Sequence, residues 1–96
     1  MRRLVVLSLH AALDAVRQES LRAVRAEYPD ERIEVEPWPY DRPHVYRCRV
    51  NGRPAGPPFA LEDVVGEGMR RGREAAVRGL AGWLSQQVML HLQTVE

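Results

Sequence analysis

The segment "GEGMRRGRE", residues 66–74, carries the residues of this chain that are best suited to bind an anion. Glycines expose backbone N–H groups, and arginine side chains hydrogen-bond phosphate or carboxylate in pairs. The Walker phosphate loop needs a lysine, which this chain lacks, and a dinucleotide-binding loop would need glycine where Arg71 stands. Both loops also need a preceding strand. We therefore expect the glycines to serve close helix packing, a helix break near residues 66–68, or both.

The arginines of this segment leave a nucleic-acid function open. The stretch "GEGMRRGREAAVRGL", residues 66–80, is similar to the start of the second helix in double-stranded-RNA-binding domains, an α-β-β-β-α family in which a basic cluster meets phosphates. Arginines replace the family's lysines, Arg73 and Arg78 stand at alanine positions, and the strands expected at both chain ends have no counterpart. The resemblance implies duplex RNA or DNA binding. Its candidate anion-binding residues are Arg70, Arg71, Arg73 and Arg78.

Histidine, cysteine and serine residues form no catalytic or metal-binding pattern. His10 and His44 approach each other in the fold expected below, but their spacing is not that of metal ligands, so we expect no metal and no cofactor. Cys48 is the one cysteine, which excludes an intramolecular disulfide, and strand alternation places it in the core. We therefore expect no catalytic residue, and a binding protein is favoured over an enzyme.

The composition indicates one small globular domain, residues 1–96. The net charge of +1, with 14 basic residues that are all arginine, lacks the general field of a strongly basic nucleic-acid binder. The N-terminal apolar run is broken by His10 and ended by Asp14, and no run approaches the roughly 20 residues of a membrane span. We expect a cytoplasmic protein without membrane contact, of bacterial-type high-GC composition.

Two segments have the spacing of amphipathic helices. Between residues 10 and 28, buried positions recur every three or four residues until Pro29 ends the pattern. A second face recurs in the same way from Leu61 to about Gln86. The two faces consist of Leu13, Val16, Ser20, Val24 and Tyr28, and of Val65, Met69, Gly72, Ala76, Leu80 and Trp83.

Four segments are predicted as strands. "LVVLSL" at 4–9 is a short apolar run, and "ERIEVE" at 31–36 and "HVYRCRV" at 44–50 alternate between apolar and charged residues. "QVMLHLQTV" at 87–95 also alternates, although it can be read as an extension of the second helix. Asn51-Gly52 predicts a tight turn, and the three prolines of "PWPYDRP" at 37–43 predict a loop that displays aromatic side chains.

The order β-α-β-β-α-β predicts an α+β, ferredoxin-like split β-α-β fold, with a four-stranded antiparallel sheet in the order 4-1-3-2 and two helices on one face. The open face would carry an apolar stripe from residues 4–9 beside charged residues of the middle strands, and monomers seldom expose such a patch. We therefore expect an interaction or assembly module that self-associates as a homodimer or docks onto a protein partner. The predicted sheet interface is Val5, Leu7, Leu9, Glu34, Glu36, Val45, Arg47, Arg49, Met89 and His91, and the predicted loop contact is Trp38, Tyr40, Asp41 and His44.

A third class of function is a small dimeric ligand-binding protein or enzyme with a pocket between sheet and helices. The aromatic residues that would line this pocket are Trp38, Tyr40, Phe59 and Trp83. The identity of a partner, any substrate, and the exposed face of residues 4–9 stay open at this point.

Overall fold

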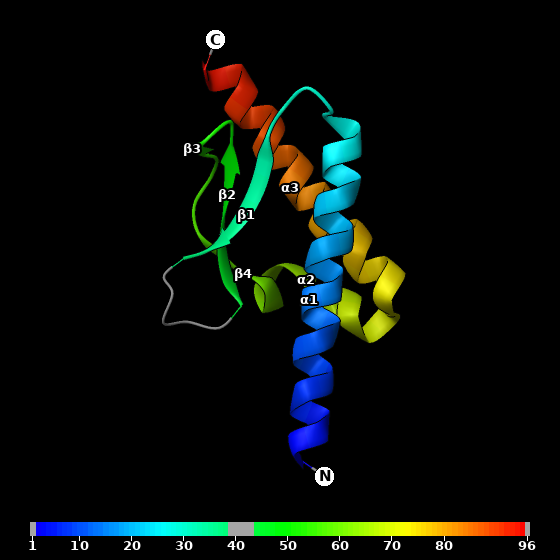
Figure 1. The fold of residues 1–96 in the computed structure, drawn as a ribbon. Helices are drawn as coiled ribbons and strands as arrows, with labels where there is room; N and C mark the ends of the chain where they lie inside the picture. Colours follow the sequence, from blue (N-terminus) through cyan, green and yellow to red (C-terminus); the bar gives the residue numbers. More distant parts are fainter. Residues whose placement is uncertain (1, 39–43, 96) are drawn as a thin grey trace.

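The computed structural model describes the backbone of residues 2–38 and 44–95 and the side chains of residues 11–38, 44–66 and 68–94. Helices form both ends of the described chain, and a small antiparallel sheet lies between them in sequence and packs on them through one face (Figure 1). The elements in chain order are α1 (Arg2–Glu27), β1 (Ile33–Pro37), β2 (Val45–Val50), β3 (Arg53–Pro54), β4 (Phe59–Ala60), α2 (Leu61–Arg71) and α3 (Arg73–Val95).

The predicted ferredoxin-like βαββαβ fold is wrong, because both chain ends are helical. Residues 4–9 belong to α1, and residues 87–95 belong to α3, which confirms the alternative interpretation of that segment as a helix extension. No glycine or proline separates either segment from the neighbouring helix. Extending a formed helix by one residue costs less free energy than ending it and nucleating a new element, so each helix continues through the segment.

The C-terminal segment also satisfies the helical period. Ala76, Leu80, Leu84 and Val88 are four residues apart and buried, and Leu92 packs against the same core. A strand would have placed neighbouring residues alternately in and out of the core. The helix instead buries one continuous stripe from its first turn to its last.

The sheet differs from the predicted order 4-1-3-2 but keeps the predicted alternation of its two main strands. β1 pairs antiparallel with β2, with Ile33 opposite Val50 and Glu34 opposite Arg49, so one face is apolar and the other charged. The other edge of β2 pairs with β3 at one end and with β4 at the other. The predicted turn at Asn51-Gly52 joins β2 to β3, and both residues have the positive φ (54° and 82°) that a two-residue hairpin turn requires.

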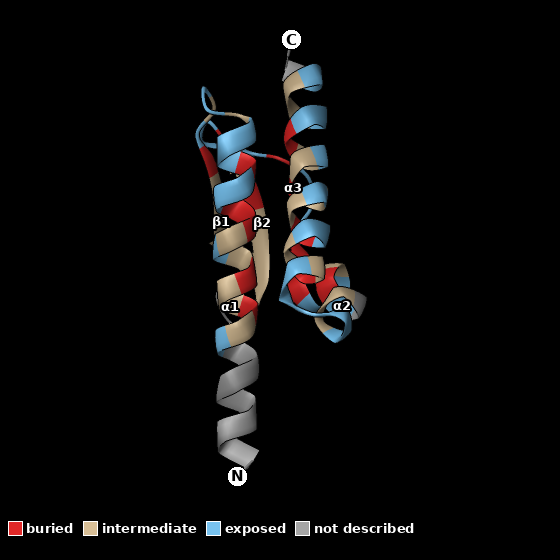
Figure 2. Ribbon diagram, turned by 90° about the vertical axis from the view of Figure 1, so that its right-hand side faces the viewer, coloured by how far each residue is buried: buried red, intermediate tan, exposed pale blue. Residues whose placement is uncertain are grey.

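The core lies between the apolar face of the sheet and the two long helices. α1 packs against β1 and α3 against β2, and the two helices run in the same direction (Figure 1). Their buried residues line the sides that face each other (Figure 2). Ser20 of α1 is fully buried at this contact, and its hydroxyl donates to the Val77 carbonyl oxygen at 3.2 Å. The other buried residues of these elements include Leu13, Val16, Val24, Ile33, Cys48, Val50, Ala76, Leu80, Leu84 and Val88.

The glycine-rich segment 66–74 is divided between two helices. Gly72, with a φ of 115°, separates α2 from α3, so the helix break lies at this residue and not near 66–68. Gly68 has the predicted packing role, because a Cβ at this position would lie 2.8 Å from the Cα of Ala76. A Cβ at Gly66, in the same helix, would meet nothing within 4 Å. Close approach of α2 to α3 therefore requires glycine at residue 68 but not at residue 66.

Gly68→Ala and Gly66→Ala should have opposite effects on stability. Gly68→Ala pushes α2 away from α3 and should lower the free energy of unfolding by about 1–3 kcal/mol, as overpacking does. Gly66→Ala should raise it by up to about 1 kcal/mol, because alanine is the better helix former. Chemical denaturation followed by circular dichroism measures both changes. Equal stabilisation by the two substitutions would contradict the close packing of α2 on α3.

Candidate functional site

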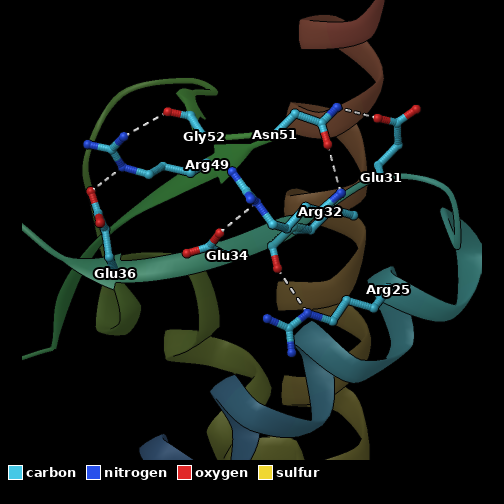
Figure 3. Close-up of polar contacts among 9 residues, drawn as sticks. Arg25, Glu31, Arg32, Glu34, Glu36, Arg49, Asn51 and Gly52 are labelled. Carbon is cyan, nitrogen blue, oxygen red and sulfur yellow. Dashed lines mark hydrogen bonds and ion pairs between the residues drawn. The ribbon is translucent and has the colours of Figure 1, made fainter.

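The charged residues predicted for one face of the sheet do share that face. Glu34 and Glu36 of β1 lie opposite Arg49 and Arg47 of β2. Arg49 pairs diagonally with Glu36, and Arg32 pairs with Glu34 at 3.2 Å (Figure 3). Ion pairs as exposed as these add at most about 1 kcal/mol each, so they orient the side chains more than they stabilise the fold.

The apolar stripe predicted beside those charges is not part of the sheet. Three of its residues belong to α1, and their side chains lie outside the described residues; two others belong to α3. Val45 is half-buried on the charged face, opposite Ala60. Association of two sheets face to face thus loses the apolar strand on which the prediction depended. The residues on α1 are Val5, Leu7 and Leu9, and those on α3 are Met89 and His91.

The loop between β1 and β2 is described only at its two ends. Trp38 is 40% exposed, and the Arg47 guanidinium lies 5.0 Å from the centroid of its ring. At the other end, the carbonyl oxygen of His44 accepts a hydrogen bond from the Leu61 N–H at 2.9 Å. Tyr40 and Asp41, the remaining predicted loop contacts, lie outside the described residues.

The predicted anion-binding arginines lie at and beyond the corner between α2 and α3. Two occupy the last turn of α2, one begins α3, and one lies further along α3. Arg73 forms an ion pair with Glu19 of α1, and Gly72 joins two helices instead of a strand and a helix, so the corner has no phosphate-loop geometry. The four exposed side chains are Arg70, Arg71, Arg73 and Arg78.

The residues weighed for metal binding and for a ligand pocket do not form such sites among the described side chains. His10 lies outside those side chains, and within them no three His, Cys, Asp or Glu residues gather as metal ligands. The Phe59 ring lies 4.3 Å from the Trp83 ring, centroid to centroid, and 6.4 Å from the Tyr46 ring. Phe59 and Trp83, two of the four aromatic residues predicted to line a pocket, therefore pack against each other.

β1 has an edge that no other described strand covers. The N–H of Asn51 donates to the Arg32 carbonyl at 2.8 Å, and the N–H of Trp38 donates to the Val45 carbonyl at 3.1 Å. Antiparallel hydrogen bonding alternates, so the even-numbered residues between them turn their backbone groups toward β2. The N–H and C=O of Val35 then point outward and have no hydrogen-bond partner within the described part of the chain. Such an edge is a template for another strand.

Arg25 of α1 reaches around to this edge. Its Nε donates to the Ile33 carbonyl oxygen at 2.9 Å, as Figure 3 shows. Pro37 has no N–H, so it limits the edge at the other end. The stretch available for pairing is therefore short and centred on Val35.

A basic depression lies on the face of α1 that is adjacent to the edge. Its volume is about 360 Å³, and five residues of α1 line it. The Arg17 guanidinium lies 5.3 Å from the centroid of the Tyr46 ring in β2, and Arg25 contacts Ile33 in β1, so two of the lining arginines also contact the hairpin. Asp14 accepts from Arg17 Nη2 at 2.6 Å and from Gln18 Nε2 at 2.9 Å. The lining residues are Arg17, Gln18, Leu21, Arg22 and Arg25.

The lining residues of the depression share one side of α1 by their spacing alone. Arg17 and Arg25 are eight residues apart, with Leu21 midway, and Gln18 and Arg22 repeat the same interval of four. This spacing places all five on one side of a helix. The proximity of that side to an open strand edge depends on tertiary packing, which the spacing does not reveal.

No family model, curated protein or solved structure shows significant similarity to this chain. Among the residues that the structure describes, no helix combines the length and apolar character of a membrane span. The open edge of β1 and the arginine-lined depression of α1 form the candidate site.

Cys48 is not available as a nucleophile, in agreement with the expectation that it points into the core. Its side chain is fully buried in β2, and burial raises the pKa of the thiol from 9.0 to about 11. The reactive thiolate is therefore rare in the folded protein near neutral pH.

The buried thiol should make stability depend on pH above its ordinary pKa. Between about pH 9 and 11 the unfolded chain releases the proton that the folded protein still holds, so the free energy of unfolding should fall across that window. Denaturation curves of the wild type and of Cys48→Ala, at matched pH values, isolate this effect, because the tyrosines titrate in both proteins. Identical pH dependence in the two proteins would contradict the burial of the thiol.

Proposed function

We propose that this protein is a non-enzymatic interaction module that binds an extended segment of a partner protein as an added strand on β1. The observation that carries the proposal is the open edge of β1 beside the basic depression of α1. Val35 offers an N–H and a C=O in the geometry in which strands pair. In this mode of recognition, main-chain hydrogen bonds supply affinity and neighbouring side chains supply selectivity.

A second copy of this chain is a poor occupant of the same edge. Antiparallel pairing of two β1 strands about a two-fold axis would bring Glu34 and Glu36 near the same residues of the other copy. Like charges that face each other across strands destabilise a sheet. The arginines of the two α1 helices would also approach each other. A different protein is therefore the proposed partner, and the predicted homodimer would need another surface.

A cytoplasmic location is part of the proposal. Cys48 is free and buried, which suits a compartment in which disulfides are rare. The proposed site needs only main-chain and arginine chemistry, which does not depend on an oxidising environment.

Removal of one backbone donor tests strand addition without changing a side chain. Cys48 permits total synthesis by ligation of residues 1–47 to residues 48–96, with an N-methyl group placed on Val35. Peptides selected from a random displayed library on the wild-type protein should lose about tenfold or more in affinity for the N-methylated protein, because the outward N–H is gone and the methyl group blocks the edge.

The matched control carries the N-methyl group on Gly56, an exposed loop residue on the other side of β2. Both synthetic proteins should retain the circular dichroism spectrum of the wild type. Equal affinity of the selected peptides for all three proteins would contradict strand addition, and so would a failure to select any peptide.

Duplex nucleic-acid binding is a second candidate, favoured by the order of the elements. A helix, an antiparallel sheet and a final long helix follow one another as in the α-β-β-β-α domains, although α2 intervenes before α3. The basic corner consists of Arg70 and Arg71 at the end of α2 and Arg73 at the start of that last helix. Filter binding to duplex RNA and DNA at low and high salt tests it; affinity should fall with salt and with Arg70→Ala and Arg71→Ala combined. An affinity that changes neither with salt nor with the double substitution would exclude nucleic-acid binding at this corner.

A further inference from the structure

We infer that the segment bound at β1 carries carboxylates at alternate positions, on the side that faces α1. The inference rests on the proposed function and adds the chemistry of the partner. An added strand keeps the two-residue period of the sheet, so its side chains point alternately toward α1 and toward the outer face. Those two environments differ in charge.

The side toward α1 offers guanidinium groups with unused hydrogen-bond donors. Arg22 is exposed and has no ion pair within the described residues. Arg25 uses its Nε on the Ile33 carbonyl, which leaves its terminal nitrogens for a ligand. Arg17 already pairs with Asp14 through Nη2, and its Nε is buried out of reach of a ligand. Arg22 and Arg25 are therefore the arginines available to the partner. Carboxylates are the groups that pair with guanidinium in bidentate fashion.

On the outer side, the carboxylates of Glu34 and Glu36 lie nearest to an added strand, and Arg47 and Arg49 lie one strand further away. An added strand would place its outward side chains next to Glu34 and Glu36 of β1, which already pair with Arg32 and Arg49. A carboxylate of the partner at this position would lie beside the carboxylates of β1, and the arginines nearest to them are already paired. Acidic residues are therefore favoured at inward positions and disfavoured at outward positions.

The occupant that fits both sides is an extended peptide in which acidic residues alternate with uncharged or basic ones. Leu21, which is 8% exposed and lines the depression, offers an apolar contact for the CH₂ groups of a glutamate side chain. A phosphodiester chain would satisfy the arginines, and its oxygens can accept from the Val35 N–H, but a phosphate carries no donor for the Val35 C=O. Charge and edge geometry together therefore favour a polypeptide over a nucleic acid.

Four capped peptides of the length of β1 test the inference by isothermal titration at low salt. In the first, glutamate alternates with threonine; in the others, glutamine replaces glutamate, arginine replaces glutamate, or glutamate occupies every position. The alternating acidic peptide should bind about tenfold more tightly than the glutamine peptide, as expected for one lost charge-assisted hydrogen bond. It should also bind more tightly than the all-glutamate and the arginine peptides, and its advantage should shrink with salt.

Two arginine variants locate the effect. Arg22→Gln should weaken the alternating acidic peptide about tenfold. Arg53→Gln makes the same change of charge on β3, across the sheet from β1, and should leave affinity unchanged. Both side chains are exposed, so neither substitution should alter folding.

The outcomes separate this inference from the proposed function. Equal binding of the acidic and glutamine peptides, still lost on N-methylation of Val35, would overturn the acidic preference and leave strand addition standing. If the acidic peptide bound the N-methylated protein as tightly as the wild type, strand addition would be overturned. Displacement of the peptide by duplex RNA, with loss of RNA affinity in Arg22→Gln, would assign these arginines to a nucleic acid and overturn the inference.

Discussion

The contact between α1 and α3 is the interaction on which the rest of the molecule depends. Both helices present a stripe of apolar or small residues, and the small side chains of Ser20 and Ala76 are fully buried among them. The apolar face of the β1–β2 hairpin closes the same core through Ile33, Cys48 and Val50. Because the two chain ends are committed to this helix pair, neither is available to extend the sheet. The edge of β1 is open for that reason.

Local signals in the sequence were sufficient for the central hairpin. Alternation from Ile33 to Glu36 and from Tyr46 to Val50 predicted the two strands and their faces, and Asn51-Gly52 predicted the turn. The helical stripe from Leu13 to Val24 was equally clear, because each member is buried as its spacing indicated. The two strands are bounded by proline, glycine or turn residues, and the helical stripe ends at Pro29, so these features can be recognised without knowledge of the rest of the chain.

The two chain ends were misread because their patterns satisfy two periods at once. "LVVLSL" is short and apolar, and "VMLHLQTV" alternates while also continuing the interval of four that runs through Leu80, Leu84 and Val88. Neither segment has a breaker on the side that joins it to a helix. Packing on a neighbouring helix decides such cases, and the pattern within a segment does not show which part of the chain it will pack against. Tertiary packing also decides the roles of the glycines. Gly68 allows α2 to approach α3 and Gly72 separates the two helices, although the sequence around the two residues does not distinguish these roles.

The candidate site could be predicted only in its parts. The spacing of the α1 arginines predicts that they share a face, and the alternation of β1 predicts a strand. Whether the edge of β1 is open depends on which other segments pair with it, and the pattern of β1 itself does not show this. Amide hydrogen exchange on the free protein, read residue by residue by NMR, measures this most directly. The account predicts slow exchange at Glu34 and Glu36, whose N–H groups point to β2, and fast exchange at Val35 between them. Equally slow exchange at all three amides would mean that the edge is covered, and would contradict the account.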